Sequence, residues 1–215
     1  MKRNEGVMIN MEKRKVRSDK KRDVKPTISI ELKNCIYRLA YVTNTPVKNV
    51  VSIICEKGIK SRKVIEYLSQ YFRREYKYMN TIYIGDLARE SLQRKSQPGK
   101  NERITTRFTQ SLYEDIKVLS DALDVTPTKA TAILLDASVR NTNLLNSFVK
   151  KFLHDHIDNN RMKELKLVLK YINKNNPYDE EISWFTLLSM IFEELKDGTI
   201  NVRDMISNWI EKYKE

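Results

Sequence analysis

The sequence contains few of the residues from which catalytic loops and metal sites are built. Its 215 residues include five glycines, two cysteines and two histidines. It has no glycine-rich phosphate loop, no CxxC pair and no nucleophile–histidine signature. The two histidines, in HDHID (154–158), would lie on different sides of a helix, which disfavours a shared metal ion. We therefore expect neither an enzyme nor a cofactor or metal site.

Long apolar runs are missing as well. No stretch of 18 apolar residues occurs, so no membrane-spanning helix is expected, and the basic N-terminus lacks the apolar core of a signal peptide. Cys35 and Cys55 each fall within an apolar helical pattern, which is typical of packed thiols in a reducing compartment. These absences predict a cytoplasmic protein without a membrane partner.

The scarcity of glycine and the 32% content of charged residues favour a mostly α protein over a β-sandwich or an α/β enzyme. The formal net charge is +12 and the isoelectric point is near 9.5. Such a surplus predicts a polyanionic partner, nucleic acid first and an acidic membrane second. A basic surface without a specific partner is the alternative, because charge bears on association and not on fold.

The segment RITTRF (103–108) alternates in a way that predicts a half-buried strand. In an extended chain its even-numbered residues face one way, and Arg103, Thr105 and Arg107 face the other. A single strand would leave its backbone donors and acceptors unpaired. A partner strand is therefore required.

The sequence contains one unit twice. Residues 44–72 align with residues 125–153 at an offset of 81, which places Thr-Pro-x-Lys (45–48) over Thr-Pro-x-Lys (126–129). Upstream the offset becomes 80, which indicates one residue lost from the turn of the first unit. In that part Ser29 aligns with Thr109.

The second unit follows a simple plan of strand, helix, turn and helix. Thr109 is a candidate N-cap for a helix whose apolar stripe runs to Leu123. Thr126 would cap a second helix that opens with Pro127, the preferred first position of proline. A third helix is expected to begin near Thr142.

This plan resembles the ribbon-helix-helix family of Arc and the methionine repressor, over residues 103–139 and less closely over 24–58. In that family two copies pair their strands into an antiparallel ribbon that enters the DNA major groove. The tandem arrangement is similar to that of TraY-type conjugation accessory proteins. The resemblance leaves open whether the partner strand comes from the first repeat or from a second chain.

Two registers are possible for the strand of the first unit, Val24–Ile28 and Thr27–Leu32. The first is preferred because it makes Ser29 a helix N-cap like Thr109. It places Pro26 mid-strand, where proline is tolerated only at edges or bulges. The outward residues would then be Asp23, Lys25 and Thr27.

The resemblance implies two kinds of DNA contact. Arginine can form two hydrogen bonds with guanine, and threonine can bond several base edges. The predicted base contacts are Arg103, Thr105, Arg107, Lys25 and Thr27. Helix N-termini favour anions, and the predicted phosphate contacts are Thr126, Lys129, Thr45 and Lys48. A solvated strand face and ordinary helix capping are the alternatives.

If the ribbon forms within one chain, the first repeat should face one half of the DNA site and the second repeat the other. That arrangement predicts an asymmetric site or a direct repeat.

The expected organisation is a basic flexible arm (1–22), a ribbon-helix-helix repeat with an extra helix (23–78), a linker (79–101), a second such repeat (102–158) and a C-terminal helical region (159–215). The arm would lie along phosphates, enter a minor groove or only aid solubility. The C-terminal region is expected to join chains or recruit a protein, so deletion at about Asp158 should leave binding to a single DNA site largely intact and reduce cooperativity between adjacent sites or lose the partner.

The resemblance implies a sequence-specific double-stranded DNA-binding protein. The family includes transcriptional repressors, relaxosome accessories and partition proteins, and fold alone does not choose among them. Abundant Lys, Ile and Asn are typical of an AT-rich bacterial source, which favours a regulator of a plasmid or other mobile element. A protein-interaction scaffold with only non-specific DNA affinity is the alternative from another class.

Overall fold

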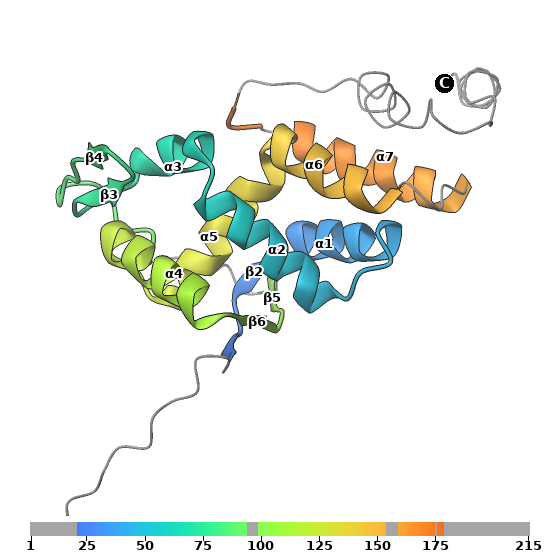
Figure 1. Cartoon of the computed structure of the whole chain (residues 1–215), viewed down its shortest axis with the longest axis horizontal. Coiled ribbons are helices and arrows are strands. Elements are labelled where there is room, and N and C mark those ends of the chain that lie inside the picture. Colours follow the sequence, from blue (N-terminus) through green and yellow to red (C-terminus); the bar gives the residue numbers. More distant parts are fainter. Residues whose placement is uncertain (1–20, 94–98, 154–158, 175, 179–215) are drawn as a thin grey trace, which may run out of the picture.

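The computed structural model describes residues 21–93, 99–153, 159–174 and 176–178, and it is mostly helical. Figure 1 shows α1 and α4 on opposite sides of the contacting helices α2 and α5, with β1, β2, β5 and β6 at one end. The elements are β1 (Arg22–Val24), β2 (Thr27–Ser29), α1 (Ile30–Val42), α2 (Val47–Ile59), α3 (Arg62–Ser69), β3 (Tyr76–Tyr78), β4 (Thr81–Tyr83), β5 (Asn101–Arg103), β6 (Thr106–Phe108), α4 (Gln110–Leu123), α5 (Pro127–Arg140), α6 (Thr142–Leu153) and α7 (Asn159–Asn173).

The partner of the RITTRF strand comes from the first repeat of the same chain. β1 pairs with β6 and β2 pairs with β5, both antiparallel and in one continuous register. Between these pairs the carbonyl of Pro26 accepts a hydrogen bond from Ile104 N at 3.1 Å. Residues 22–29 and 101–108 therefore form one two-stranded ribbon, in which every strand is an edge and the missing N–H of Pro26 can be tolerated.

The buried side of the ribbon confirms the strand register preferred from the sequence. Its buried residues are Val24, Pro26, Ile28, Ile104, Thr106 and Phe108. The hydroxyl of Ser29 accepts from Leu32 N at 3.1 Å at the start of α1. The hydroxyl of Thr109 does the same for Leu112 N at 3.3 Å at the start of α4. Both predicted N-caps are confirmed, and the alternative register Thr27–Leu32 is excluded because α1 begins at Ile30.

The offset of 81 expected for the second helices is wrong, since the structural repeat keeps an offset of 80. The left-handed turn residues are Asn44 and Asp124, with φ of 46° and 54°. After them, the N-cap positions are Pro46 in α2 and Thr126 in α5. The Thr-Pro-x-Lys match was therefore shifted by one residue.

The buried positions of the second helices follow the same offset. In α2 these are Val50, Val51, Ile54, Cys55, Gly58 and Ile59, and in α5 their counterparts are Ala130, Thr131, Leu134, Leu135, Ser138 and Val139. No residue is lost from the turn of the first unit. Packing therefore defines the repeat better than the short Thr-Pro-x-Lys match does.

The two repeats share one hydrophobic core. α2 packs against α5, and each second helix also contacts a strand of the other repeat, α2 on β6 and α5 on β2. The α2–α5 contact is close at Gly58, where a Cβ atom would lie 1.8 Å from Ser138 Oγ. The buried hydroxyl of Thr106 donates to the carbonyl of Lys48 at 2.8 Å and ties the start of α2 to the ribbon. Neither repeat is thus packed as an independent domain.

The predicted linker, residues 79–101, contains structure that the sequence did not indicate. Strand β4 lies in this range and forms an antiparallel hairpin with β3, which ends just before it, and β5 begins at Asn101. The amides of Arg73 and Arg74, which precede the hairpin, donate to the carbonyl of Ala122 in α4 at 2.8 and 3.0 Å. The hairpin is thereby held against the second repeat.

Helix α7 belongs to the core and does not begin a separate module. It lies along α1 and buries Met162, Leu165, Val168, Leu169 and Ile172. Glu164 in α7 forms an ion pair with Arg38 in α1, with 2.9 Å between Oε2 and Nε. The boundary predicted at Asp158 is therefore not a boundary of the packed core.

Some predictions concern residues that the structure does not describe. These are the arm up to residue 20, the HDHID segment and the part of the predicted C-terminal helical region beyond residue 178. Within the described residues, none of the helices has the length and apolarity needed to cross a membrane. Cys35 and Cys55 are both buried, which confirms that they are packed thiols.

Candidate nucleic-acid interface

The outer side of the ribbon brings all five predicted base-contact residues onto one face. Arg103, Thr105, Arg107 and Lys25 are exposed there, and Thr27 is half-buried. Asp23 is exposed on the same face. These side chains point outward because their neighbours along each strand are buried on the helices. The face carries three positive charges and one negative charge.

The register groups these residues differently from the expected division between repeats. Asp23 lies opposite Arg107 and Thr27 lies opposite Arg103. The same register places Lys25 opposite Thr105 at the centre. Each end of the ribbon therefore combines one residue from each repeat, so the two repeats do not occupy separate ends of the ribbon as the expected division of the half-sites assumed.

One end of the ribbon contains an ion pair that the sequence did not reveal. Arg107 Nε donates to Asp23 Oδ1 at 2.7 Å, and the side chains remain 61% and 57% exposed. Asp23 was predicted to face outward, but its partner follows only from the cross-strand register. The pair leaves the terminal nitrogens of Arg107 free to contact a ligand, since only Nε is used in this bond.

Helices α2 and α5 both contact the ribbon, α2 at β6 and α5 at β2, and the carbonyl of Lys48 in the first turn of α2 accepts from Thr106 of the ribbon. In α5 the hydroxyl of Thr126 accepts from Lys129 N at 3.3 Å, which confirms Thr126 as the N-cap. Both residues are at least partly exposed. Thr128 in the same turn has an amide with no partner inside the helix, as is general for first-turn amides.

The start of α2 differs from the start of α5. Thr45 does not cap α2, since its hydroxyl donates to the carbonyl of Thr43 at 3.0 Å. The N-cap residue is Pro46, which supplies no side-chain bond. Lys48 is exposed in the first turn. Of the predicted phosphate contacts, Thr126, Lys129 and Lys48 are thus placed at helix N-termini as expected, and the Thr45 hydroxyl is committed elsewhere.

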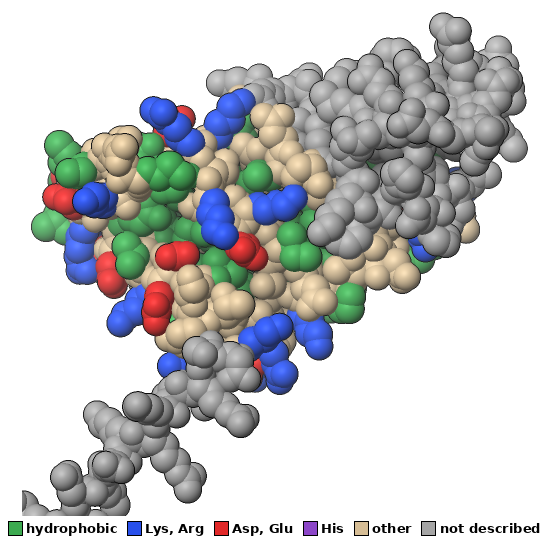
Figure 2. Space-filling model, viewed as in Figure 1, with side chains coloured by type: hydrophobic (Ala, Val, Ile, Leu, Met, Phe, Trp, Pro, Cys, Tyr) green, Lys and Arg blue, Asp and Glu red, His purple; other side chains and the backbone are tan. Residues whose placement is uncertain are grey.

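Further basic side chains surround the ribbon. Arg22, predicted to lie in the flexible arm, is part of β1. Its Nε donates to Gln110 Oε1 at 2.9 Å, and its guanidinium lies 5.9 Å from the Tyr113 ring centroid. A hydrogen bond from Lys33 to Glu102 raises the pKa of Lys33, and the two side chains form an ion pair. Figure 2 shows several Lys and Arg side chains at the end of the molecule where the ribbon lies, and others spread over the rest of that face.

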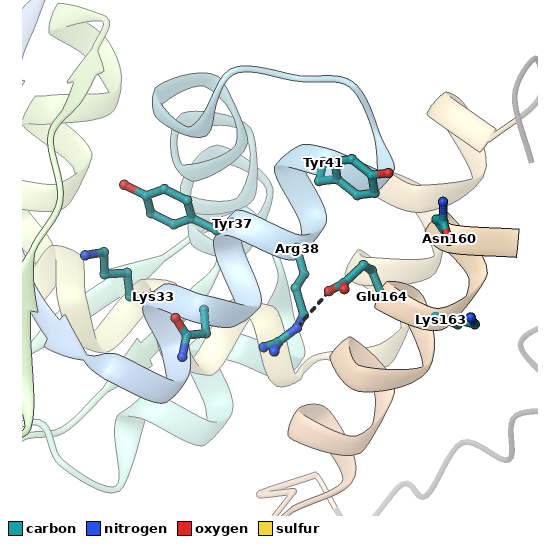
Figure 3. A pocket seen from close by; sticks show the side chains of 8 residues that line it. Lys33, Tyr37, Arg38, Tyr41, Asn160, Lys163 and Glu164 are labelled. Atoms are coloured by element: carbon teal, nitrogen blue, oxygen red, sulfur yellow. Dashed lines mark hydrogen bonds and ion pairs between the residues drawn. The ribbon is translucent and has the colours of Figure 1, made fainter. Parts of the chain in front are cut away.

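A groove of about 750 Å³ lies between α1 and α7. Figure 3 shows the ion pair of Arg38 and Glu164 across this groove, with Tyr37 and Tyr41 along α1. Its lining contains one carboxylate and neither histidine nor cysteine. In the part of the chain that the structure describes, no group of three or more His, Cys, Asp and Glu side chains could hold a metal ion.

Comparison of the chain with protein-family models, with curated proteins and with solved structures finds no match. The functional assignment therefore depends on the residues and geometry of the chain itself.

Proposed function

We propose that this chain is a sequence-specific double-stranded DNA-binding protein of the ribbon-helix-helix type. Its two units would together supply one β-ribbon that reads the major groove. The observation that carries this proposal is the intrachain ribbon of residues 22–29 and 101–108, with its alternate residues buried on the helices. Its other face presents Lys25, Arg103, Thr105 and Arg107 to solvent.

The dimensions and chemistry of such a ribbon suit the major groove of B-DNA, which admits a two-stranded β-ribbon. Arginine side chains on it can recognise guanine O6 and N7, and Thr105 can contact several base edges or a thymine methyl group. The exposed face of an isolated two-stranded ribbon is open to unwanted pairing, and DNA binding gives its row of polar and basic side chains a function. Base contacts would come from the ribbon.

Phosphate contacts would come from the first turns of α2 and α5, on either side of the ribbon. Free amides and the helix dipole favour an anion at such positions. Lys48 and Lys129 add positive charge, and Thr126 adds a hydroxyl at α5. Contacts of this kind fix the position of a protein on the duplex without reading its sequence. The formal net charge of +12 supports the same partner.

The biological role that we propose is regulation of transcription in a bacterial plasmid or other mobile element, in the cytoplasm. A relaxosome accessory or a partition protein would use the same ribbon, and fold does not separate these roles. Footprinting on DNA around the protein's own gene distinguishes them. Protection of the promoter supports a regulator, and protection of a nick site or of centromere-like repeats supports the other roles.

A protein-interaction scaffold is a second candidate function. It is favoured by exposed apolar side chains at and after the β3–β4 hairpin, namely Met79, Ile82, Ile84 and Leu87. Exposed apolar patches often mark protein contacts. A scaffold would bind DNA through charge alone, without sequence preference.

Selection from a random duplex pool tests the proposal. The full chain is incubated with the pool at about 200 mM salt, where binding that depends only on 6–10 phosphate contacts is about 10³- to 10⁵-fold weaker than at 50 mM. We expect enrichment of one sequence that is bound at least about 10³-fold more tightly than its shuffled version. Failure to enrich any sequence would contradict DNA recognition and favour the scaffold.

A further inference from the structure

The two ends of the ribbon are chemically different, although the fold relates them by an approximate twofold axis. The axis passes near the central pair Lys25 and Thr105, and it exchanges positions 80 residues apart. One end carries Asp23 and Arg107, which form an ion pair. At the other end Arg103 lies opposite the neutral Thr27. A symmetric pair of half-sites would therefore meet two unlike surfaces.

The ion pair changes what Arg107 can do. With Nε bonded to Asp23 at 2.7 Å, the guanidinium plane is oriented, and its terminal nitrogens remain available to a guanine edge. The second carboxylate oxygen of Asp23 can accept from the amino group of cytosine. Arg103 has no carboxylate opposite it and is less constrained. The two arginines thus present different hydrogen-bonding groups.

The helix N-termini beside the two ends of the ribbon also differ from each other. Beside the Arg103 end, α5 contacts β2, and the first turn of α5 offers the Thr126 hydroxyl and Lys129. Beside the Arg107 end, α2 contacts β6, and Pro46 supplies no side-chain cap. The unlike ribbon ends and the unlike helix N-termini therefore define a direction along the bound DNA.

We propose that Asp23 is a positioning and specificity-determining residue, which fixes Arg107 so that one half of the DNA site is read differently from the other. The chain then binds an asymmetric site in a single orientation. This inference rests on the proposed function, because it assumes that the ribbon enters the major groove. It predicts that removing the Asp23 charge alters base preference in one half-site only.

The test compares selected sequences and quantitative binding for three variants of the full chain. Asp23→Asn removes the carboxylate charge and keeps the side-chain size. Glu66→Gln is the matched control, because Glu66 lies on α3 and forms an ion pair of the same 2.7 Å length with Arg62. Thr27→Asp places a carboxylate opposite Arg103, so that each end carries an Arg–Asp pair, although the two pairs occupy opposite strands with respect to the twofold axis. Exposed ion pairs contribute little to stability, so all three variants should fold, which thermal unfolding verifies.

For the wild type we expect a non-palindromic site, with discrimination of roughly 5- to 150-fold at each base pair that an arginine contacts. Asp23→Asn should reduce discrimination about fivefold or more at base pairs of one half-site, and leave the other half unchanged. Glu66→Gln should select the wild-type sequence. Thr27→Asp should change base preference in the half-site that Arg103 contacts and leave the other half unchanged.

Several results would overturn the inference. A wild-type site with identical palindromic halves would show that the unlike ends are not read. Equal effects of Asp23→Asn on both halves, or no effect on either, would remove the positioning role of Asp23 while DNA recognition itself stands. Absence of any selected sequence for the wild type would instead refute the proposed function, and the inference with it.

Discussion

Deletion of α7 should unfold the chain, contrary to what the sequence suggested for a cut at Asp158. Helix α7 buries Met162, Leu165, Val168, Leu169 and Ile172 to 5% exposure or less. Full burial of such a side chain contributes about 1.5–3 kcal/mol, so the five together contribute on the order of 7–15 kcal/mol. That sum is an upper estimate, but it is as large as the total stability of a typical domain, about 5–15 kcal/mol.

The assay is thermal and urea unfolding followed by circular dichroism. A chain that ends after Asp158 is compared with one that ends after Tyr178, which retains α7. We expect no cooperative transition for the shorter chain and a cooperative one for the longer chain. A cooperative transition of equal midpoint in both would refute the assignment of α7 to the core.

A point substitution gives a milder form of the same test. Leu165→Ala should lower the free energy of unfolding by about 2–5 kcal/mol, because the side chain is fully buried. Leu167→Ala is the matched control on the same helix, since Leu167 is 43% exposed. Equal losses for the two variants would contradict the observed orientation of α7.

Three further predictions concern the core and the C-terminal segment. Gly58→Ala should lower the free energy of unfolding by about 1–3 kcal/mol, because its Cβ would lie 1.8 Å from Ser138 Oγ. Adding Ser138→Gly should relieve this loss, as measured by urea unfolding of the double variant. Additive losses from the two substitutions would contradict the close contact. Burial raises the pKa of Cys35 to about 12 and raises that of Cys55 as well, so both thiols stay protonated at pH 8. They should therefore react with a thiol reagent only when the chain unfolds. Rapid labelling of the native chain would contradict this prediction. Deletion of residues 179–215 should preserve binding to one DNA site and reduce cooperativity between adjacent sites. Mobility shift measures the binding and its cooperativity, and light scattering measures the mass of the assembly. Unchanged cooperativity and mass would contradict an assembly role for this segment.

Local signals in the sequence were sufficient for many features of the fold. Ser29, Thr109 and Thr126 were identified as N-caps because capping depends on residues only three positions apart. The outward residues of the second strand followed from alternation, and those of the first strand followed from aligning Ser29 with Thr109 as helix N-caps. The start of the third helix of the second repeat near Thr142 was also predicted correctly.

Features that depend on contacts between distant segments could not be predicted. The pairing of Asp23 with Arg107 requires the cross-strand register, which joins residues 84 positions apart. The hairpin has three-residue strands, too short for a periodic pattern to develop. The role of α7 depends on α1, more than 100 residues earlier. The wrong offset of 81 arose because the four-residue Thr-Pro-x-Lys motif was given more weight than the buried positions of α2.

The central claim is that the intrachain ribbon reads DNA sequence while the flanking helix N-termini hold phosphates. Salt-dependent titration of the preferred duplex and its shuffled version, with Arg103→Ala, Lys129→Ala and the distant control Arg62→Ala, tests this most directly. Arg103→Ala should weaken binding to the preferred duplex by about 1–3 kcal/mol and change binding to the shuffled duplex much less. Lys129→Ala should weaken both duplexes alike and reduce the salt slope by about one unit, and Arg62→Ala should change neither. Equal weakening of both duplexes by Arg103→Ala would contradict the claim that the ribbon reads the sequence.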